Sequence, residues 1–261
     1  MTTPTPPCRR RRRSSWPALF VALSVVPLAA GGVRLNQLVG GAPVTPSNAR
    51  FFAAPTPVVL HIVAAFGFAL VGAFQFAPGL RRRRSGWHRV AGRFTVVAGL
   101  VVALSGLWMT LFYARPPGDG DLLTAMRLGF GTAMAFSLVA GLVAVLRRDL
   151  TGHRAWMVRG YAIGMGAGTQ VLTNLPWVLL VGAPSESTRA VLMGAGWVIN
   201  LVVAEVVIRR TGRIGQPRSG TTAPVPDADS IDQPPQARAL TVSSTNSPTQ
   251  NSPGTWVSRP S

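Results

Sequence analysis

The chain has 261 residues, of which 48% are hydrophobic and 13% are charged, and its formal net charge is +18 at pH 7. Ordinary soluble domains carry about 25% charged residues, so this composition excludes a typical soluble domain and favours a membrane protein. The single cysteine, Cys8, excludes an intramolecular disulfide and a metal site built from several cysteines.

Six long apolar segments follow one another along the chain. Each is close to the ~20 residues with which an α-helix crosses the hydrocarbon core of a bilayer. They cover residues 16–33, 58–76, 94–113, 125–146, 160–181 and 190–208. The alternation of polar and apolar residues that is typical of membrane β-barrels is absent. We therefore predict an all-α membrane protein in which residues 16–208 form a bundle of six transmembrane helices.

The two ends of the chain differ from this region in composition. Residues 1–15 are basic and contain a run of arginines at 9–13, which together with the next apolar stretch also resembles a signal peptide. Residues 28–31 form a poor cleavage site, so we expect an uncleaved first helix. Residues 209–261 are rich in Pro, Ser and Thr and cannot bury enough apolar surface to fold, which predicts a disordered cytoplasmic tail.

The arginines are unevenly distributed among the connections. Most lie before the first span, between the second and third, between the fourth and fifth, and after the sixth. The opposite connections hold only Arg34, Arg50, Arg115, Arg127 and Arg189. Arginine-rich connections stay in the cytoplasm, which predicts a plasma-membrane protein with both termini inside. The same arginines would contact anionic lipid headgroups, so the positive charge requires no nucleic-acid partner.

Five polar residues within the spans lie on faces that we expect to point into the bundle, because a polar side chain facing lipid would lack hydrogen-bond partners. They are His61, Gln75, Gln170, Asn174 and Asn200. Such residues either line a substrate path or join helices through hydrogen bonds.

Two further patterns concern contacts of the fifth and sixth spans. The fifth has Gly160, Gly164 and Gly168 at four-residue spacing, which predicts a face of close helix contact. Glu205 is the only carboxylate within a predicted span and precedes Arg209 by four residues. We expect these two side chains to pair along one helix.

Two of the three histidines each stand in an arginine-rich segment directly before a span. The first segment contains His88, Arg89 and Arg93, and the second contains His153, Arg154 and Arg159. Both imidazoles are therefore expected at similar depth on the cytoplasmic side. The two hairpins that carry them resemble a degenerate parallel repeat.

These elements also carry a family resemblance. The patterns His-Arg-x-x-Gly-Arg at residues 88–93 and His-Arg-x-Trp-Met-x-Arg at 153–159, together with His61 and Gln75, resemble the bacterial membrane family called domain of unknown function 2306. The resemblance covers residues 58–182. It implies the membrane class and the signature residues, and it assigns no reaction. In the family pattern an arginine-bearing segment stands where this chain has residues 169–172.

The sequence leaves three functions open. In the first, the two His/Arg segments form a cytoplasmic pocket that contacts anionic lipid headgroups, and the protein is not an enzyme. In the second, His88 and His153 ligate a b-type haem or engage a quinone, with nearby arginines pairing with propionates. In the third, the polar interior serves a small-solute transporter, although no pair of broken helices marks a site at the membrane midplane.

We favour the first function, a non-enzymatic membrane protein. The histidines lack the carboxylates and the spacing of a metal or hydrolase site, so we expect no metal centre. The sequence also leaves open whether the chain forms a homo-oligomer.

Overall fold

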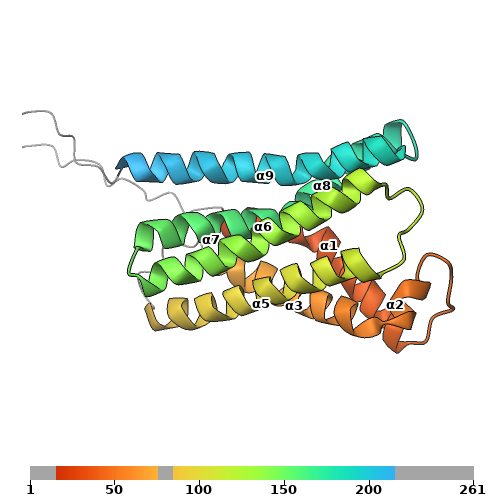
Figure 1. Ribbon diagram of the computed structural model, residues 1–261, viewed down its shortest axis with the longest axis horizontal. Coiled ribbons are helices and arrows are strands. Elements are labelled where there is room, and N and C mark those ends of the chain that lie inside the picture. The colour runs from red at the N-terminus through yellow and green to blue at the C-terminus, as the bar shows by residue number, and fades with distance from the viewer. Residues whose placement is uncertain (1–15, 76–84, 215–261) are drawn as a thin grey trace, which may run out of the picture. The chain divides into compact units, whose positions relative to one another are not determined.

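The computed structural model describes residues 16–75 and 85–214, and within them the regular structure is entirely α-helical (Figure 1). The predicted all-helical class is therefore confirmed. The helices are α1 (Trp16–Val39), α2 (Ala49–Ala53), α3 (Pro55–Gln75), α5 (Ser85–Phe112), α6 (Asp121–Leu146), α7 (Leu150–Gly164), α8 (Gly166–Leu180) and α9 (Glu186–Ile214). The predicted basic N-terminus at residues 1–15 lies outside the described residues. The predicted disordered tail covered residues 209–261; residues 209–214 instead form the end of α9, and the rest lies outside the described residues.

Five of the described helices are long and apolar enough to cross a membrane. Their crossing segments are Ala18–Val39, Pro55–Gln75, Gly86–Phe112, Asp121–Leu146 and Glu186–Thr211. Large apolar side chains cover their outward faces; Val97 and Leu104 of α5, for example, are 62% and 59% exposed. Apolar surface on this scale requires a lipid environment. The chain is therefore a multi-pass helical membrane protein.

Helices that follow one another in sequence pack side by side. α3 lies along α5, α5 along α6, α6 along α7 and α8 along α9 (Figure 1). α1 packs against both α3 and α8, and α9 also contacts α6 and α7. These contacts place α1 and α9 beside the junction between α7 and α8.

The predicted span at residues 160–181 is divided into two helices at this junction. α7 ends at Gly164 and α8 begins at Gly166, with Met165 between them. Glycine weakens a helix interior by about 1 kcal/mol relative to alanine, and Gly164, Gly166 and Gly168 surround the interruption. Because this span is not one continuous helix, the predicted number of six crossings stays a prediction.

Side chains of neighbouring helices complete the hydrogen bonding at the interruption. Asn200 of α9 donates from Nδ2 to the carbonyl oxygen of Ala162 in α7, at 3.0 Å. Its Oδ1 accepts from Oγ1 of Thr169 in α8, at 2.8 Å. An unsatisfied backbone carbonyl costs several kcal/mol in lipid. One asparagine thus satisfies the carbonyl before the interruption and joins the two half-helices.

The glycines of the interruption let the neighbouring helices approach closely. A Cβ atom at Gly168 would lie 2.2 Å from the carbonyl oxygen of Leu23 in α1, and one at Gly166 would lie 2.3 Å from Cδ1 of Trp197 in α9. Both distances are far inside van der Waals contact. The close helix contact that the sequence predicts at Gly168 is therefore present, and it is made with α1.

The core between α3, α6 and α7 is built around two aromatic rings and a leucine. The ring centroids of Phe68 and Tyr161 are 5.2 Å apart, and Leu138 is fully buried beside them. The Tyr161 hydroxyl donates to the carbonyl oxygen of Ala69 at 3.0 Å, so its polar atom is satisfied within the apolar interior. A Cβ atom at Gly72 would lie 2.3 Å from the tyrosine ring. The bundle is closely packed at this level.

Candidate functional site

The second predicted His/Arg segment lies at the start of α7 and contacts the neighbouring helices. Nδ1 of His153 is 2.7 Å from the carbonyl oxygen of Gly141 in α6, and Arg154 is exposed. Arg159 donates to both carboxylate oxygens of Glu205 in α9, from Nε at 2.6 Å and from Nη2 at 3.2 Å. Arg159 therefore joins α7 to α9.

The expected pairing of Glu205 with Arg209 is replaced by this pair between helices. The guanidinium carbon of Arg159 also lies 4.8 Å from the ring centroid of Trp156. The sequence pattern missed the pair because the rule for residues four apart considers a single helix. The contact between α7 and α9 is instead produced by the fold.

The first predicted His/Arg segment lies in the first turns of α5. Arg89 and Arg93 are exposed, and His88 is half-buried. Residues of the two His/Arg segments line neither of the two cavities described below. A ligand pocket at this end of the bundle therefore stays a prediction.

The five predicted interior polar residues lie in different surroundings. His61 and Gln170 line one cavity, and Gln170 donates to a backbone carbonyl of α9 at 3.1 Å. Asn200 lies at the helix interruption, and Asn174 donates to the carbonyl oxygen of Gln170 within α8 at 2.8 Å. Gln75 is half-buried at the end of α3. Of the five, His61 and Gln170 are the two that line this cavity.

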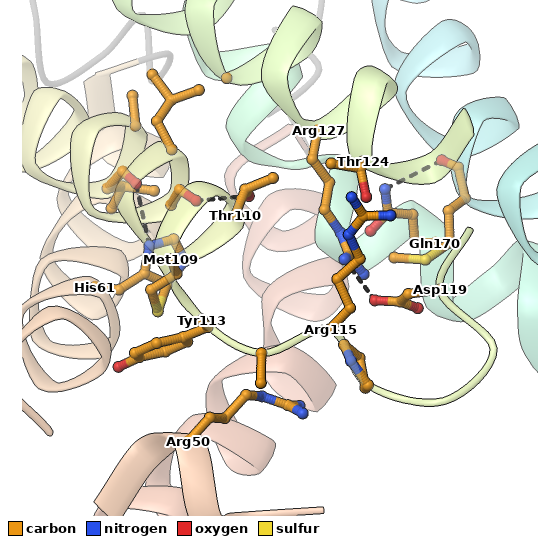
Figure 2. Close-up of a pocket in the computed structure, with 18 of the residues that line it drawn as sticks. Arg50, His61, Met109, Thr110, Tyr113, Arg115, Asp119, Thr124, Arg127 and Gln170 are labelled. Atoms are coloured by element: carbon orange, nitrogen blue, oxygen red, sulfur yellow. Dashed lines mark hydrogen bonds and ion pairs between the residues drawn. The ribbon is translucent and has the colours of Figure 1, made fainter. Parts of the chain in front are cut away.

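The cavity has a volume of about 360 Å³ and lies among α2, α3, α5, α6 and the loop between α5 and α6 (Figure 2). Figure 2 shows Arg50 entering from α2 and Arg127 entering from α6 on the other side of the same space. Its walls also include the apolar side chains of Leu107, Ile163 and Trp197. The cavity thus combines guanidinium groups with apolar surface.

The loop between α5 and α6 shapes the charged end of the cavity. The backbone N–H of Asp119 donates to the carbonyl oxygen of Pro116 at 3.2 Å. Gly118, within this turn, has a φ of 82°, in the left-handed region that favours glycine. The turn buries the Asp119 side chain, which is 1% exposed. A carboxylate buried to this extent requires positive partners.

Two arginines supply those partners. Nη1 of Arg127 lies 2.5 Å from Oδ2 of Asp119, and Nε of Arg189 lies 3.0 Å from its Oδ1. Arg115, which also lines the cavity, pairs with the exposed carboxylate of Asp121. Asp119 of the loop and Asp121, the first residue of α6, are therefore already paired with arginines.

Arg50 differs from the other arginines of the cavity. In the part of the chain that the structure describes, no carboxylate lies within 4.0 Å of it. Its guanidinium carbon is 4.5 Å from the ring centroid of Phe51, and that of Arg34 lies at the same distance. Burial lowers the pKa of Arg50, and Arg34 and Arg127 lower it further, whereas Asp119 raises it. An anion beside Arg50 would relieve this repulsion.

Tyr113 holds α2, and with it Arg50, against the end of α5. Its hydroxyl donates to the carbonyl oxygen of Ala54 at 2.6 Å, and its ring meets that of Phe51 edge to face at 5.6 Å. Burial raises the pKa of Tyr113, so the phenol remains a protonated donor at neutral pH. The position of Arg50 is thus fixed by contacts between α2 and α5.

His61 keeps one ring nitrogen available for a ligand. Its Nδ1 lies 3.1 Å from the carbonyl oxygen of Val102 and 3.0 Å from Oγ of Ser105. The Ser105 hydroxyl itself donates to the carbonyl oxygen of Val101 at 2.5 Å. Both neighbours therefore accept, which assigns the proton to Nδ1. Nε2 then carries a lone pair and makes no hydrogen bond to any residue in 16–75 or 85–214.

In the sequence, Arg50, Arg115 and Arg127 stand out only as the few arginines on the side opposite the arginine-rich connections, and no pattern predicts this cavity. A signal was present at Asp119, a carboxylate in a short Pro- and Gly-containing loop between two apolar spans. Such a residue requires a cation, and the minority arginines were the available partners. The missing information was the fold of the loop.

The family comparison agrees with the motifs. Residues 58–208 match the family described as "Predicted membrane protein (DUF2306)". The matched segment includes His61, Asp119 and Arg127, and it begins after Arg50. No curated protein and no solved structure matches the chain. The predicted resemblance is therefore confirmed, and because the match spans more than half of the chain, this protein belongs to that family of membrane proteins.

Proposed function

We propose that this membrane protein binds a small organic anion in the cavity beside Arg50 and is not an enzyme. The observation that carries the proposal is the half-buried Arg50, which lines the cavity and has no carboxylate within 4.0 Å among the described residues. Arginine binds carboxylate and phosphate groups through two parallel hydrogen bonds. A volume of about 360 Å³ falls within the usual range of small-molecule sites.

The charges around the cavity support an anionic ligand. Asp119 pairs with Arg127 and Arg189 and forms no ion pair with Arg50. Arg50 and Arg127 both line the cavity, and the pKa of Arg50 is lowered by burial and, to a smaller extent, by the charge of Arg127. An anion placed between them interacts with both. The apolar wall formed by residues such as Leu107 favours a ligand with a partly apolar body.

The orientation in the membrane is part of the proposal. The chain would cross the plasma membrane six times, with α7 and α8 forming one interrupted crossing and both termini in the cytoplasm. The exposed Arg89, Arg93 and Arg154 at the starts of α5 and α7 support this orientation. These arginines would contact anionic lipid headgroups. The cavity beside Arg50, at the opposite end of α5, would then open to the outside.

The His/Arg segments have two other interpretations, as a pocket for lipid headgroups and as a haem or quinone site. Both interpretations use Arg159, which is already paired. Arg159 is bonded to both carboxylate oxygens of Glu205, so a lipid phosphate or a haem propionate would have to displace that carboxylate. His153 is already bonded to the carbonyl oxygen of Gly141 through Nδ1. An absorption spectrum of the purified protein tests haem binding directly. A Soret band with reducible α and β bands would restore that alternative.

Isothermal titration of the full-length protein in detergent tests anion binding, with lactate and phenyl phosphate as the two probes. Loss of a charged hydrogen-bond donor costs about 1.5–3 kcal/mol, which corresponds to roughly 10- to 100-fold in affinity. Arg50→Gln should therefore weaken binding of the better probe at least 10-fold. Arg34→Gln is the matched control, because Arg34 contacts the same ring of Phe51 but does not line the cavity. Equal affinity in Arg50→Gln and the unmodified protein would overturn the proposal, as would the absence of binding of both probes.

A further inference from the structure

A second cavity lies next to the first and shares part of its wall. It has a volume of about 140 Å³, and His61 and Val102 line both cavities. Its other walls come from α1, α3 and the interruption between α7 and α8, and they include Leu28, Ile62 and Phe66. His61 is the one titratable residue in this lining. We call the cavity beside Arg50 the outer cavity and this one the inner cavity.

The two cavities follow one another along the bundle. On α3, the outer cavity is lined by His61, and the inner cavity extends from His61 to Ala69, which is about 12 Å further along the helix. The helix interruption faces both. Ile163 and Gln170 on its two sides line the outer cavity. The inner cavity is lined by Gly164, Met165, Ala167 and Gly168. Irregular backbone at membrane depth occurs where it lines a cavity or a substrate site.

Beyond the inner cavity the interior is closed. Phe68, which lines it, packs against Tyr161 with ring centroids 5.2 Å apart. A Cβ atom at Gly164 would lie 2.5 Å from the Phe68 ring, and one at Gly72 would lie 2.3 Å from the Tyr161 ring. These contacts leave no space between α3 and α7 at this level. The cavity system is therefore wide at the Arg50 end and, among the described residues, closed between α3 and α7 towards the arginine-rich end.

We propose that the protein carries monocarboxylic acids across the membrane together with a proton, and that His61 transfers this proton between the outer and inner cavities. The proposal rests on the anion binding proposed above, and it adds movement of the ligand past His61. The outer cavity collects the carboxylate at Arg50 and Arg127. The inner cavity receives the neutral acid.

Each transfer moves one proton from His61 to the carboxylate of the ligand. The imidazolium form of His61 gives the proton on Nε2 to a carboxylate oxygen of the ligand, which becomes a neutral carboxylic acid. His61 returns to its neutral form, in which Nδ1–H still donates to the carbonyl oxygen of Val102. A hydronium ion from the outer solution then protonates Nε2 again, and the neutral acid releases the transferred proton into the water on the inner side.

The arrival of the anion favours protonation of His61. Through the outer cavity the imidazole faces the guanidinium groups of Arg50, Arg115 and Arg127, together with the phenol of Tyr113 and the carboxylate of Asp119. On the sides formed by α1 and by the helix interruption, the lining of the inner cavity holds no titratable group besides His61 itself. Burial in the bundle disfavours the imidazolium, and the empty outer cavity beside it carries a net positive charge. A bound carboxylate offsets that charge, so ligand binding and proton uptake occur together.

The inner cavity selects the ligand class. It is lined by apolar and small side chains, with Ser24 as its polar group besides His61 and with no charged side chain. A charged group in such surroundings is strongly disfavoured. One proton neutralises a monocarboxylate, whereas a phosphate ester keeps a negative charge after the same step. Phosphate esters should therefore bind in the outer cavity without being carried across.

Uptake into proteoliposomes that contain the full-length protein tests the proposal, with radiolabelled lactate as the probe and an acidic outer solution. We expect saturable lactate uptake with acidification of the interior, reported by a trapped pH-sensitive dye, at least 10-fold above protein-free liposomes. His61→Gln keeps an amide N–H for Val102 but cannot carry the proton, so it should lower uptake at least 10-fold. Lactate binding by this variant in detergent should no longer be accompanied by proton uptake.

A second variant tests the path independently of the histidine. Ala65 lines the inner cavity, and Ala65→Phe should fill it and abolish uptake while lactate binding persists. Val63, on the same helix, is 59% exposed and faces away from the bundle, so Val63→Phe is the matched control with unchanged uptake. Both variants introduce the same side chain into α3, so a loss in Ala65→Phe alone is not a general effect of phenylalanine.

The outcomes separate the two proposals. Lactate binding without protein-dependent uptake would overturn the transport inference and leave anion binding standing. Absence of lactate and phenyl phosphate binding would overturn both. Uptake by His61→Gln at the rate of the unmodified protein would remove the proton-transfer role. Uptake of phenyl phosphate as fast as lactate would contradict the monocarboxylate assignment.

Discussion

Arg159 on α7 and Glu205 on α9 form a two-point ion pair, with Nε and Nη2 of the arginine bonded to the two carboxylate oxygens at 2.6 and 3.2 Å. The side chains are 28% and 36% exposed, so solvent screens the pair and its loss should cost about 1 kcal/mol rather than the larger cost of a fully buried pair. We expect Glu205→Gln and Arg159→Gln each to lower the unfolding midpoint in detergent by similar amounts. The double variant should be little worse than either.

Arg209→Gln is the control for this pair. Arg209 stands four residues after Glu205 on the same helix, but the structure shows no ion pair between them. The midpoint of Arg209→Gln should therefore stay close to that of the unmodified protein. A loss in Arg209→Gln equal to that in Arg159→Gln would show that the helix pair expected from sequence is the one that stabilises the fold.

Asp119→Asn should destabilise the protein more strongly. Its carboxylate is 1% exposed and holds both Arg127 and Arg189, so its removal leaves two guanidinium groups facing each other, at a cost of about 3 kcal/mol. Because the cavity becomes more positive, saturating phenyl phosphate should recover more thermal stability in this variant than in the unmodified protein. Asp121→Asn is the matched control, since that carboxylate is 91% exposed. Equal losses in the two variants would contradict this account.

Asn200→Ala should reveal the cost of the helix interruption. The change removes both hydrogen bonds that the side chain makes to Ala162 and Thr169, and an unpaired buried polar group costs about 1–3 kcal/mol. Asn174→Ala removes a bond to a carbonyl of its own helix, at Gln170, and should cost less. Thermal unfolding of the two variants, compared side by side, measures the difference. Equal midpoints would mean that Asn200 does not support the interruption.

Cysteine labelling tests the orientation in the membrane. In a background that carries Cys8→Ser, a cysteine in place of Ser47 should react with a membrane-impermeant maleimide added to intact cells. A cysteine in place of Thr151 should react only after the membrane is opened. Both positions are exposed, Ser47 before α2 and Thr151 in the first turn of α7, so access and not burial decides the result. The reverse pattern would contradict the proposed orientation and place the cavity at Arg50 on the inner side.

Much of the helical organisation was predictable, because hydrocarbon thickness fixes the length of a crossing helix. Five of the six predicted spans overlap the helices that are long enough to cross a membrane. The interruption at Met165 was not predictable from spacing alone. Gly164 and Gly168 give the same pattern whether they let two continuous helices approach or mark the end of one helix. The structure shows both at once: α7 ends at Gly164, and Leu23 of α1 lies against Gly168.

Of the candidate site, only the residues within the predicted membrane spans could be identified from the sequence. His61 and Gln170 were identified as interior residues because an unpaired polar group cannot face lipid. Arg50 could not be identified in the same way, since it lies in a connection where an exposed arginine needs no explanation. Its role depends on the contact of Tyr113 with α2 and on the burial of Asp119. Both are results of tertiary structure and leave no periodic signal in the sequence.

The absence of a side chain at Gly168 has a mechanical consequence. The carbonyl oxygen of Leu23 in α1 lies 2.2 Å from the position that a Cβ atom at Gly168 would take, so the main chains of α1 and α8 are in direct contact there. We therefore expect α1 and α8 to move together in any motion that opens the inner cavity towards the arginine-rich end. Met165 lies between α7 and α8, so the chain would bend at this residue while α7 keeps its place.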